Sequence, residues 1–345
     1  MKDVISRNNH YLSQMYLKAW KNKKNEVYIY DLLVPNDNCP LWRSKPTRSV
    51  GSYDSMFVRL KDGIEVDDIE KWFRDRYETP AEKALEHAIN DEVITEEELH
   101  CLIDLVACHI VRSPRYIFKV LDIAKKDCVP IFEETCDEIS NLTKDDILNN
   151  NENSNNNSNE LFPLKITNMG ADEQNDSTLF KIETIFGKQF YLWNVVNILN
   201  DTAKIFHQNK WGIITVDDSV KLPTSDNPVI CLDFRSENDY NFNGGWGREN
   251  CNILMPISPN KILFTQVGTK VPDKMKLNYQ MSLLFKKMIV EHGYKTIVSS
   301  FKDDEIVKLR KRFVSEEEYL REKQMWKDFQ KDYLEKEKDY IRKIK

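Results

Sequence analysis

Three polar motifs in this sequence combine residue types that proteins use to transfer protons and to bind anions. The first is His10-Tyr11-x-x-Gln14 near the N-terminus. On a helix start, His10 and Gln14 lie one turn apart and can share a face. Because histidine titrates near neutral pH, His10 is a candidate acid, base or ligand, with Tyr11 beside it. The alternative is a histidine that only forms a hydrogen bond near a helix N-terminus.

The second motif, His109-x-x-Arg112-Ser113-Pro114-Arg115, falls where a proline must end or kink a helix. His109 continues an apolar helical stripe and should therefore point inward, with Arg112 one turn further along. A partly buried arginine needs a carboxylate or an anionic ligand. A structural ion pair with Glu78 or Asp104 is the outcome we expect. Anion binding at this motif is the alternative.

The third motif, Thr224-Ser225-Asp226-Asn227-Pro228-Val229, lies between two candidate strands. Asp226 and Asn227 favour turns because their side chains bond to the local backbone, and a turn alone would explain the motif. Ser225, Asp226 and Asn227 at a strand end would also form a polar cluster. A carboxylate in such a cluster can bind a metal or act as a base.

Helices and closely spaced strands must position these motifs. Apolar periodicity predicts helices, one of which starts at a Thr95-x-x-Glu98 capping box. The helical ranges are 11–20, 67–90 with a break at Thr79-Pro80, 95–113, 188–208 and 275–292. Strand-like runs are 26–31, 53–60, 211–216, 229–234, 253–257, 261–267 and 295–300, and three prolines make 34–51 irregular. We predict a mainly helical α+β fold with a short N-terminal strand pair, an antiparallel meander in the second half and a long C-terminal helix.

The chain divides into a body and a tail. Residues 1–314 are predicted to form a single domain, interrupted near 146–161 by an asparagine-rich, disordered insertion that a domain boundary would equally resemble. Residues 315–345 are predicted to form a charged amphipathic helix. Its aromatic residues recur every seven positions: Tyr319, Trp326, Tyr333 and Tyr340. Such a stripe is typical of a packing seam against the body, and a homodimer through this helix is the alternative.

Several familiar functions lack their signatures. The formal net charge of −6 gives no general attraction to nucleic acid or anionic membrane, although a nucleotide site or a local basic groove stays open. No dinucleotide, P-loop, zinc-protease or nucleophile-elbow motif occurs. The seven cysteines include no CxxC pair, which favours reduced thiols in a cytoplasmic protein. No membrane-spanning run or signal peptide is visible. The cofactor is thus unidentified, with a divalent metal as an open alternative.

Taken together, the motifs resemble a bacterial family catalogued as domain of unknown function 4238. Residues 9–20 are similar to its opening NHYxPQxYLxxF, residues 109–115 to its QxxRTP helix and residues 224–229 to its TSDNPV turn. Ser13 stands where the family has proline, Trp20 where it has phenylalanine, and His109 where it commonly has glutamine. The resemblance implies a bacterial cytoplasmic protein and brings no established catalytic residues.

If the fold gathers the three motifs into one pocket, they suit an enzyme, hydrolase-like or nuclease-like, acting on a phosphate-containing substrate. Bacterial defence is one setting for such an enzyme. The alternative is a non-enzymatic binding or regulatory protein that uses its C-terminal helix as an interaction surface. In the enzyme, the catalytic residues would be His10, Gln14 and Asp226, and the substrate-binding residues would be Tyr11, His109, Arg112, Arg115, Ser225 and Asn227.

Overall fold

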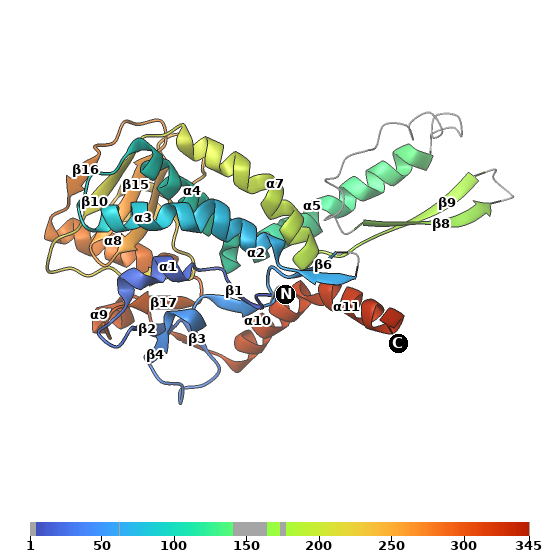
Figure 1. Cartoon of the computed structure of the whole chain (residues 1–345), viewed down its shortest axis with the longest axis horizontal. Coiled ribbons are helices and arrows are strands. Elements are labelled where there is room, and N and C mark those ends of the chain that lie inside the picture. Colours follow the sequence, from blue (N-terminus) through green and yellow to red (C-terminus); the bar gives the residue numbers. More distant parts are fainter. Residues whose placement is uncertain (1–4, 62, 141–163, 173–176, 345) are drawn as a thin grey trace.

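The computed structural model describes residues 5–61, 63–140, 164–172 and 177–344, and they form the predicted α+β fold (Figure 1). The longer helices are α3 (Thr79–Ile89), α4 (Glu96–Arg112), α5 (Pro114–Ser140), α7 (Lys188–His207), α8 (Tyr279–His292), α10 (Glu316–Phe329) and α11 (Lys331–Ile344). Shorter helical elements are α1 (Gln14–Leu17), η1 (Lys18–Trp20), η2 (Thr47–Ser49), α2 (Asp68–Phe73), the π-helix η3 (Arg74–Glu78) and α9 (Asp304–Leu309).

A six-stranded sheet forms the predicted meander in the second half of the chain. Its strand order is β13 (Asp239–Asn241), β12 (Ile230–Ser236), β14 (Asn252–Ser258), β15 (Lys261–Gln266), β10 (Trp211–Thr215) and β16 (Lys274–Lys276). All neighbours are antiparallel except β10 and β16. One face packs on Met288 and Ile289 of α8, and the other packs on α4 and α7 through residues such as Leu102 and Leu199. The sheet is therefore buried on both sides.

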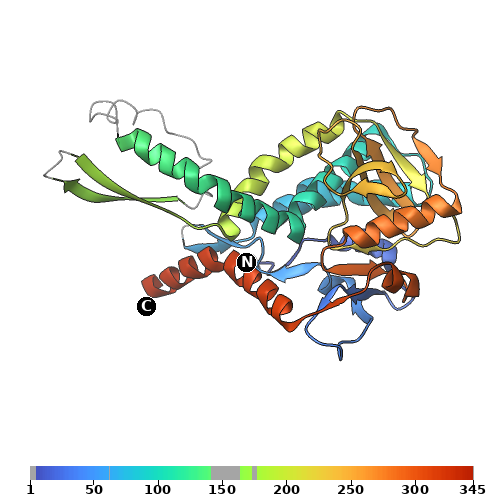
Figure 2. The ribbon, with the colours of Figure 1, turned by 180° about the vertical axis from the view of Figure 1, so that it is seen from behind.

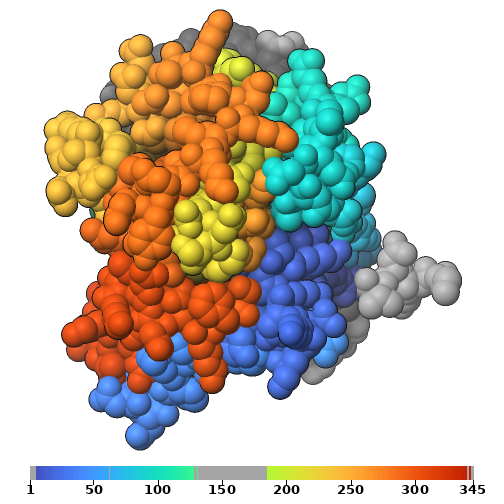
Figure 3. All heavy atoms as spheres, turned by 90° about the vertical axis from the view of Figure 1, so that its left-hand side faces the viewer, coloured from blue at the N-terminus to red at the C-terminus, as the bar shows by residue number. Residues whose placement is uncertain are grey.

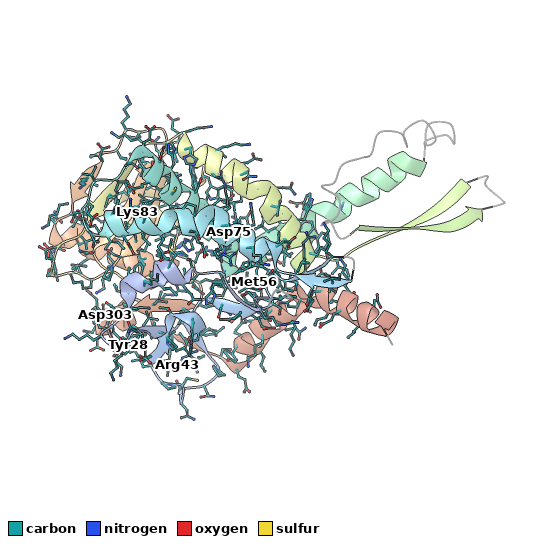
Figure 4. The ribbon with its side chains drawn as sticks, in the orientation of Figure 1. Tyr28, Arg43, Met56, Asp75, Lys83 and Asp303 are labelled. Atoms are coloured by element: carbon teal, nitrogen blue, oxygen red, sulfur yellow. The ribbon has the colours of Figure 1, made fainter. Side chains whose placement is uncertain are left out.

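A four-stranded antiparallel sheet combines two strands from the N-terminal part of the chain with two strands from its second half. Its order is β11 (Thr224–Ser225), β17 (Thr296–Ser299), β2 (Glu26–Asp31) and β4 (Arg43–Pro46). Because side chains alternate along a strand, Tyr30 and Ile297 point to one face, where they pack in a core with Ile306 of α9. Asp31 and Arg43 belong to the opposite face. Tyr28 and Arg43, both on this sheet, are labelled in Figure 4.

Smaller strand pairs complete the architecture. They are β1 (Asn8–His10) with β5 (Ser52–Asp54), β6 (Arg59–Lys61) with β7 (Ile64–Val66), β18 (Phe313–Val314) with β3 (Leu33–Val34), and β8 (Leu164–Asp172) with β9 (Ser177–Thr184). The β8–β9 ribbon and the end of α5 extend away from the body in both ribbon views (Figures 1 and 2). The predicted asparagine-rich insertion lies outside the described residues.

The C-terminal tail packs against the body of its own chain. Ser315 caps α10, and the helix is interrupted at Gln330, so the tail forms α10 and α11 in place of one long helix. Trp326 stacks on Tyr53 with ring centroids 4.2 Å apart, and Phe329 is fully buried. The side-chain amide of Gln330 donates to the carbonyl of Asp54 at 3.1 Å. Trp326 belongs to the aromatic stripe on which the dimer prediction rested.

Local signals predicted several element boundaries correctly. The Thr95–Glu98 capping box is present, and α4 ends just before Pro114. Three expectations were wrong. The segment 34–51 contains β4, which pairs with β2; the range 53–60 divides into β5 and β6; and Thr79-Pro80 continues the helical path from a π-helix without a break. Pro80 lies in the first turn of α3, the position in an α-helix where proline is best tolerated.

Candidate functional site

The N-terminal segment 8–16 brings the three sequence motifs together. Its strand β1 pairs with β5, and the amide of Leu12 continues this pairing to the carbonyl of Gly51 at 3.1 Å. The Tyr16 hydroxyl lies 2.6 Å from Thr224 Oγ1 and donates to the carbonyl of Pro256 at 2.6 Å. The Tyr16 ring packs on His109 with centroids 4.9 Å apart. In Figure 3 the N-terminal residues (blue) border segments from the later part of the chain (yellow and orange-red).

The His10–Gln14 geometry differs from the prediction. His10 ends strand β1, whereas α1 begins only at Gln14, so the two side chains do not share a helical face. The strand pairing of residues 8–10, extended at Leu12, holds this stretch extended and prevents an earlier helix start. The His10 ring nitrogen Nε2 lies 3.1 Å from the carbonyl of Arg48, and burial lowers the His10 pKa. Gln14 is exposed.

Arg112 forms the ion pair that we expected. Its guanidinium donates to Glu78 at 2.6 Å and also to the carbonyl of His10, and the side chain is only 1% exposed. The guanidinium carbon lies 4.5 Å from the centre of the Phe73 ring. Although burial alone would lower its pKa, the charge of Glu78 raises it, so Arg112 stays a cation. Arg112 thus fastens the N-terminal segment to α4 and η3.

A second carboxylate, Glu70 of α2, lies near the same cation. Burial raises the pKa of Glu70 to about 7, with Arg112 acting in the opposite direction. One of its oxygens has no hydrogen-bond partner among the described residues. Glu78 is the last residue of the π-helix η3, whose wider turn shifts the register at which Glu78 meets Arg112. Glu70 is thus available to exchange a proton near neutral pH.

His109 is neutral and enclosed. The amide of Ser13 donates to its Nε2 at 3.4 Å, and the side chain is 1% exposed. Burial, aided by the charge of Arg112, lowers the His109 pKa to about 3. Since the ring is packed between protein groups, its predicted contact with substrate would require a rearrangement. Arg115, at the start of α5, is exposed.

The third motif forms a buried turn after β11. Asp226 is 2% exposed, and its carboxylate accepts from the amide of Tyr294 at 3.0 Å and from that of Lys295 at 2.9 Å. Burial raises its pKa to about 6, although these amides and the charge of Lys295 act to lower it. Ser225 Oγ accepts from the amide of Asn227 at 3.2 Å, and the Asn227 side chain contacts His292. The turn explanation therefore holds for Ser225 and Asn227.

Asp226 and Tyr11 meet in a cavity of about 150 Å³ on the polar face of the four-stranded sheet. This volume is below the roughly 300–1,000 Å³ of sites for drug-sized ligands, and it suits a single small group. His10 adjoins the cavity through its chain neighbour Tyr11 and its cross-strand partner Ser52. The lining residues are Tyr11, Leu12, Ile29, Asp31, Arg43, Lys45, Ser49, Val50, Gly51, Ser52, Asp226, Thr296 and Val298.

Two cations on β4 form the opposite wall of this cavity. Arg43 and Lys45 are two residues apart and so share one face of the strand. Arg43 donates to Asp31 at 2.7 Å, whereas Lys45 forms no ion pair with any residue that the structure describes. Burial and the charge of Arg43 lower the Lys45 pKa. An anion beside Lys45 would relieve this repulsion.

A larger cavity of about 390 Å³ adjoins the first, since both are lined by Asp31, Arg43 and Thr296. Helix α10 supplies part of its wall through Tyr319 and Glu322. Glu322 forms an ion pair with Lys295, whose amide binds Asp226. The two cavities therefore share a wall, and the larger one has room for a further part of a ligand.

Sequence reasoning missed the cations of this site. Arg43 and Lys45 lie in the segment 34–51, where prolines obscured the strand. The available signal was the period-two alternation that is typical of a strand. Ile29 and Asp31 alternate with two tyrosines, and Arg43 and Lys45 flank a serine. The partners of β2 could not be seen, because β17 is more than 260 residues away along the chain.

Within the described ranges, no group of three His, Cys, Asp or Glu side chains is arranged to hold a metal ion. No helix in the described part of the chain is long and apolar enough to cross a membrane.

Comparison with known proteins gave one match. A family model described as a protein of unknown function (DUF4238) matches residues 8–329, which include all three motifs and the residues that line both cavities. Searches of the curated proteins and of the solved structures found no significant match.

Proposed function

The chain belongs to the DUF4238 family, whose description names no reaction, and we propose from the site that it is an enzyme acting on a small phosphate-containing substrate. One observation carries the proposal. The cavity between β4 and the Asp226 turn places an unpaired lysine opposite a carboxylate whose pKa is near neutrality.

The anionic end of the substrate binds at β4. Lys45 supplies a positive charge that forms no ion pair among the described residues, and Arg43, which is paired with Asp31, presents its guanidinium from the same face. Hydrogen bonds between a cation and a phosphate oxygen are about twice as strong as neutral ones. Ser52, which also lines the cavity, offers its hydroxyl group to a remaining oxygen.

Asp226 is the acid–base group. A catalytic acid or base works best when its pKa is near the working pH. Burial raises the pKa of Asp226 to about 6. The amides of Tyr294 and Lys295 fix the carboxylate in place. Tyr11 stays protonated because burial, followed by the charge of Asp226, raises its pKa. Its hydroxyl can therefore donate to a substrate oxygen.

His10 and Arg112 act as positioning residues in this proposal. Arg112 binds the carbonyl of His10, and the next residue is Tyr11 at the cavity wall. Displacing this strand would move the Tyr11 hydroxyl relative to Asp226. The larger cavity beside Tyr319 would hold the rest of the substrate.

Binding of inorganic phosphate, measured by titration calorimetry, tests the anion end. We expect K45A to lose binding while K24A, which removes an exposed lysine from the turn before β2, retains it. D226N should retain binding and lose turnover in a screen of phosphate monoesters and nucleotides, run with and without Mg²⁺. Equal phosphate binding by K45A and the wild-type protein would overturn the assignment. Binding that depends on Lys45 without any turnover would favour a binding protein over an enzyme.

A further inference from the structure

The larger cavity differs from the smaller one in its charge. Both cations that line it are already paired, Arg43 with Asp31 at 2.7 Å and Lys295 with Glu322 of α10. The small cavity, by contrast, contains Lys45, which has no ion-pair partner in the described part of the chain. A second phosphate group would thus find no free cation among the described residues that line the larger cavity. The part of the ligand that enters it should therefore be uncharged.

The rest of the wall of the larger cavity is largely apolar. Strand β3 and the loop that follows it contribute Leu33, Val34, Pro35 and Pro40. Arg312 holds this loop, because its guanidinium donates to the carbonyl of Cys39 at 2.7 Å and to that of Asp37 at 3.1 Å. Helix α10 lies beside β3 (Figure 1) and adds the half-buried ring of Tyr319. Such a wall suits a flat, unsaturated group that stacks on an aromatic ring.

Carboxylates supply hydrogen-bond acceptors at two places along this wall. A carboxylate has about four acceptor positions, so Asp31 and Glu322 can accept further hydrogen bonds while they stay paired. Asp31 lines both cavities, together with Thr296. Glu322 lines only the larger cavity and lies three residues after Tyr319 on α10, on the same face of the helix. A matching ligand therefore has donors where the cavities meet and at the edge of its flat group.

We propose that the larger cavity binds the nucleoside part of a nucleotide, an inference that rests on the proposed phosphate site beside Lys45. The base lies against the Tyr319 ring. It donates an exocyclic N–H to Glu322, as cytosine does to carboxylates through its N4 amino group. The ribose lies where the two cavities meet, and its hydroxyl groups donate to Asp31. The apolar wall and the aromatic ring favour this ligand over a sugar phosphate, which has no flat group to stack.

Calorimetric titration of the full chain with cytidine 5′-monophosphate, uridine 5′-monophosphate, ribose 5-phosphate and inorganic phosphate tests the base site. Stacking of the base should make cytidine monophosphate bind about 5- to 150-fold more tightly than ribose 5-phosphate. Uridine monophosphate should bind more weakly than cytidine monophosphate, because a carbonyl oxygen replaces the amino group that Glu322 accepts from. If cytidine monophosphate and ribose 5-phosphate bind equally while inorganic phosphate still binds through Lys45, this inference fails and the phosphate site stands. If no phosphate compound binds, the proposed function fails as well.

A free nucleotide and the end of a nucleic-acid strand offer the same phosphate, ribose and base. Titration with a 5′-phosphorylated dinucleotide distinguishes these two sources. A dinucleotide that binds as tightly as cytidine monophosphate identifies a strand end, and exclusion of the dinucleotide identifies the free nucleotide. Both outcomes support a base site, provided that cytidine monophosphate binds more tightly than ribose 5-phosphate.

Variants of α10 locate the base within the cavity. Y319F keeps the aromatic ring and should retain the affinity for cytidine monophosphate, whereas Y319L should lower it toward that for ribose 5-phosphate. Inorganic phosphate should bind equally to both variants, because Tyr319 does not line the small cavity. E322Q should weaken the preference for cytidine over uridine monophosphate, and E317Q, which alters an exposed residue of the same helix, should keep it. Thermal melting confirms that each variant is folded. If folded Y319L binds cytidine monophosphate as tightly as the wild-type protein does, the base does not lie in this cavity.

Discussion

Replacement of Arg112 by methionine tests whether its buried ion pair fastens the N-terminal segment to the helices. Methionine keeps much of the apolar stem that packs near Phe73 but removes the donors to Glu78 and to the carbonyl of His10. Removing one partner of a buried ion pair costs about 3–5 kcal/mol, because the remaining charge loses its compensation. The Glu78 side chain is 20% exposed and can be partly rehydrated, so we expect a loss near the lower limit, about 3 kcal/mol.

The measurement is urea unfolding followed by the fluorescence of the seven tryptophans. The matched control is R74M, which removes the exposed pair between Arg74 and Asp75, whose atoms are 2.8 Å apart. Exposed pairs contribute about 0–1 kcal/mol, so R74M should unfold near the wild-type midpoint. If R112M loses no more stability than R74M, the ion pair does not fasten the segment and the positioning role of Arg112 is wrong.

Two further predictions concern the acid sensitivity of the fold and the tail. In the folded protein the pKa of His109 is about 3, against an ordinary value of 6.5. The stability that the neutral His109 ring contributes is therefore fully present above pH 6.5 and is lost as the pH falls toward 3. H109Q keeps an acceptor for the Ser13 amide. Between pH 7 and pH 5, its free energy of unfolding should fall by about 2 kcal/mol less than that of the wild-type protein. Urea midpoints that fall equally in both proteins would contradict this. Truncation after Val314 removes the buried Trp326 and Phe329, each contributing about 1.5–3 kcal/mol, and should lower the thermal midpoint strongly. A truncated chain that melts at the wild-type temperature would show that the tail is dispensable for folding.

The sequence was most informative where structure depends on neighbouring residues. The capping box at Thr95, the helix end before Pro114 and the four meander strands follow from side-chain periodicity and turn chemistry. The long tail helix was also evident, although its interruption at Gln330 was not. At that interruption the Gln330 side chain contacts Asp54, which lies far away in the sequence.

The candidate site was harder to predict because non-local pairing builds it. Tyr11 and Asp226 were identified from their motifs, and both line the small cavity. Arg43 and Lys45 reach it only because β4 pairs with β2 and β2 pairs with β17. No local pattern specifies these pairings. The same limit explains the His10–Gln14 prediction, since strand pairing with β5 delays the start of the predicted 11–20 helix to Gln14.

The pH dependence of phosphate-ester turnover tests the proposed active site most directly. With Asp226 as the base, the rate should rise as the pH passes about 6, because the carboxylate then becomes ionised. D226N should lower the rate by about 10²–10⁴-fold and remove this rise. D218N, which alters an exposed carboxylate paired with Lys276, should change neither. If folded D226N keeps the wild-type rate and the same rise near pH 6, Asp226 is not the acid–base group and the cavity is not the active site.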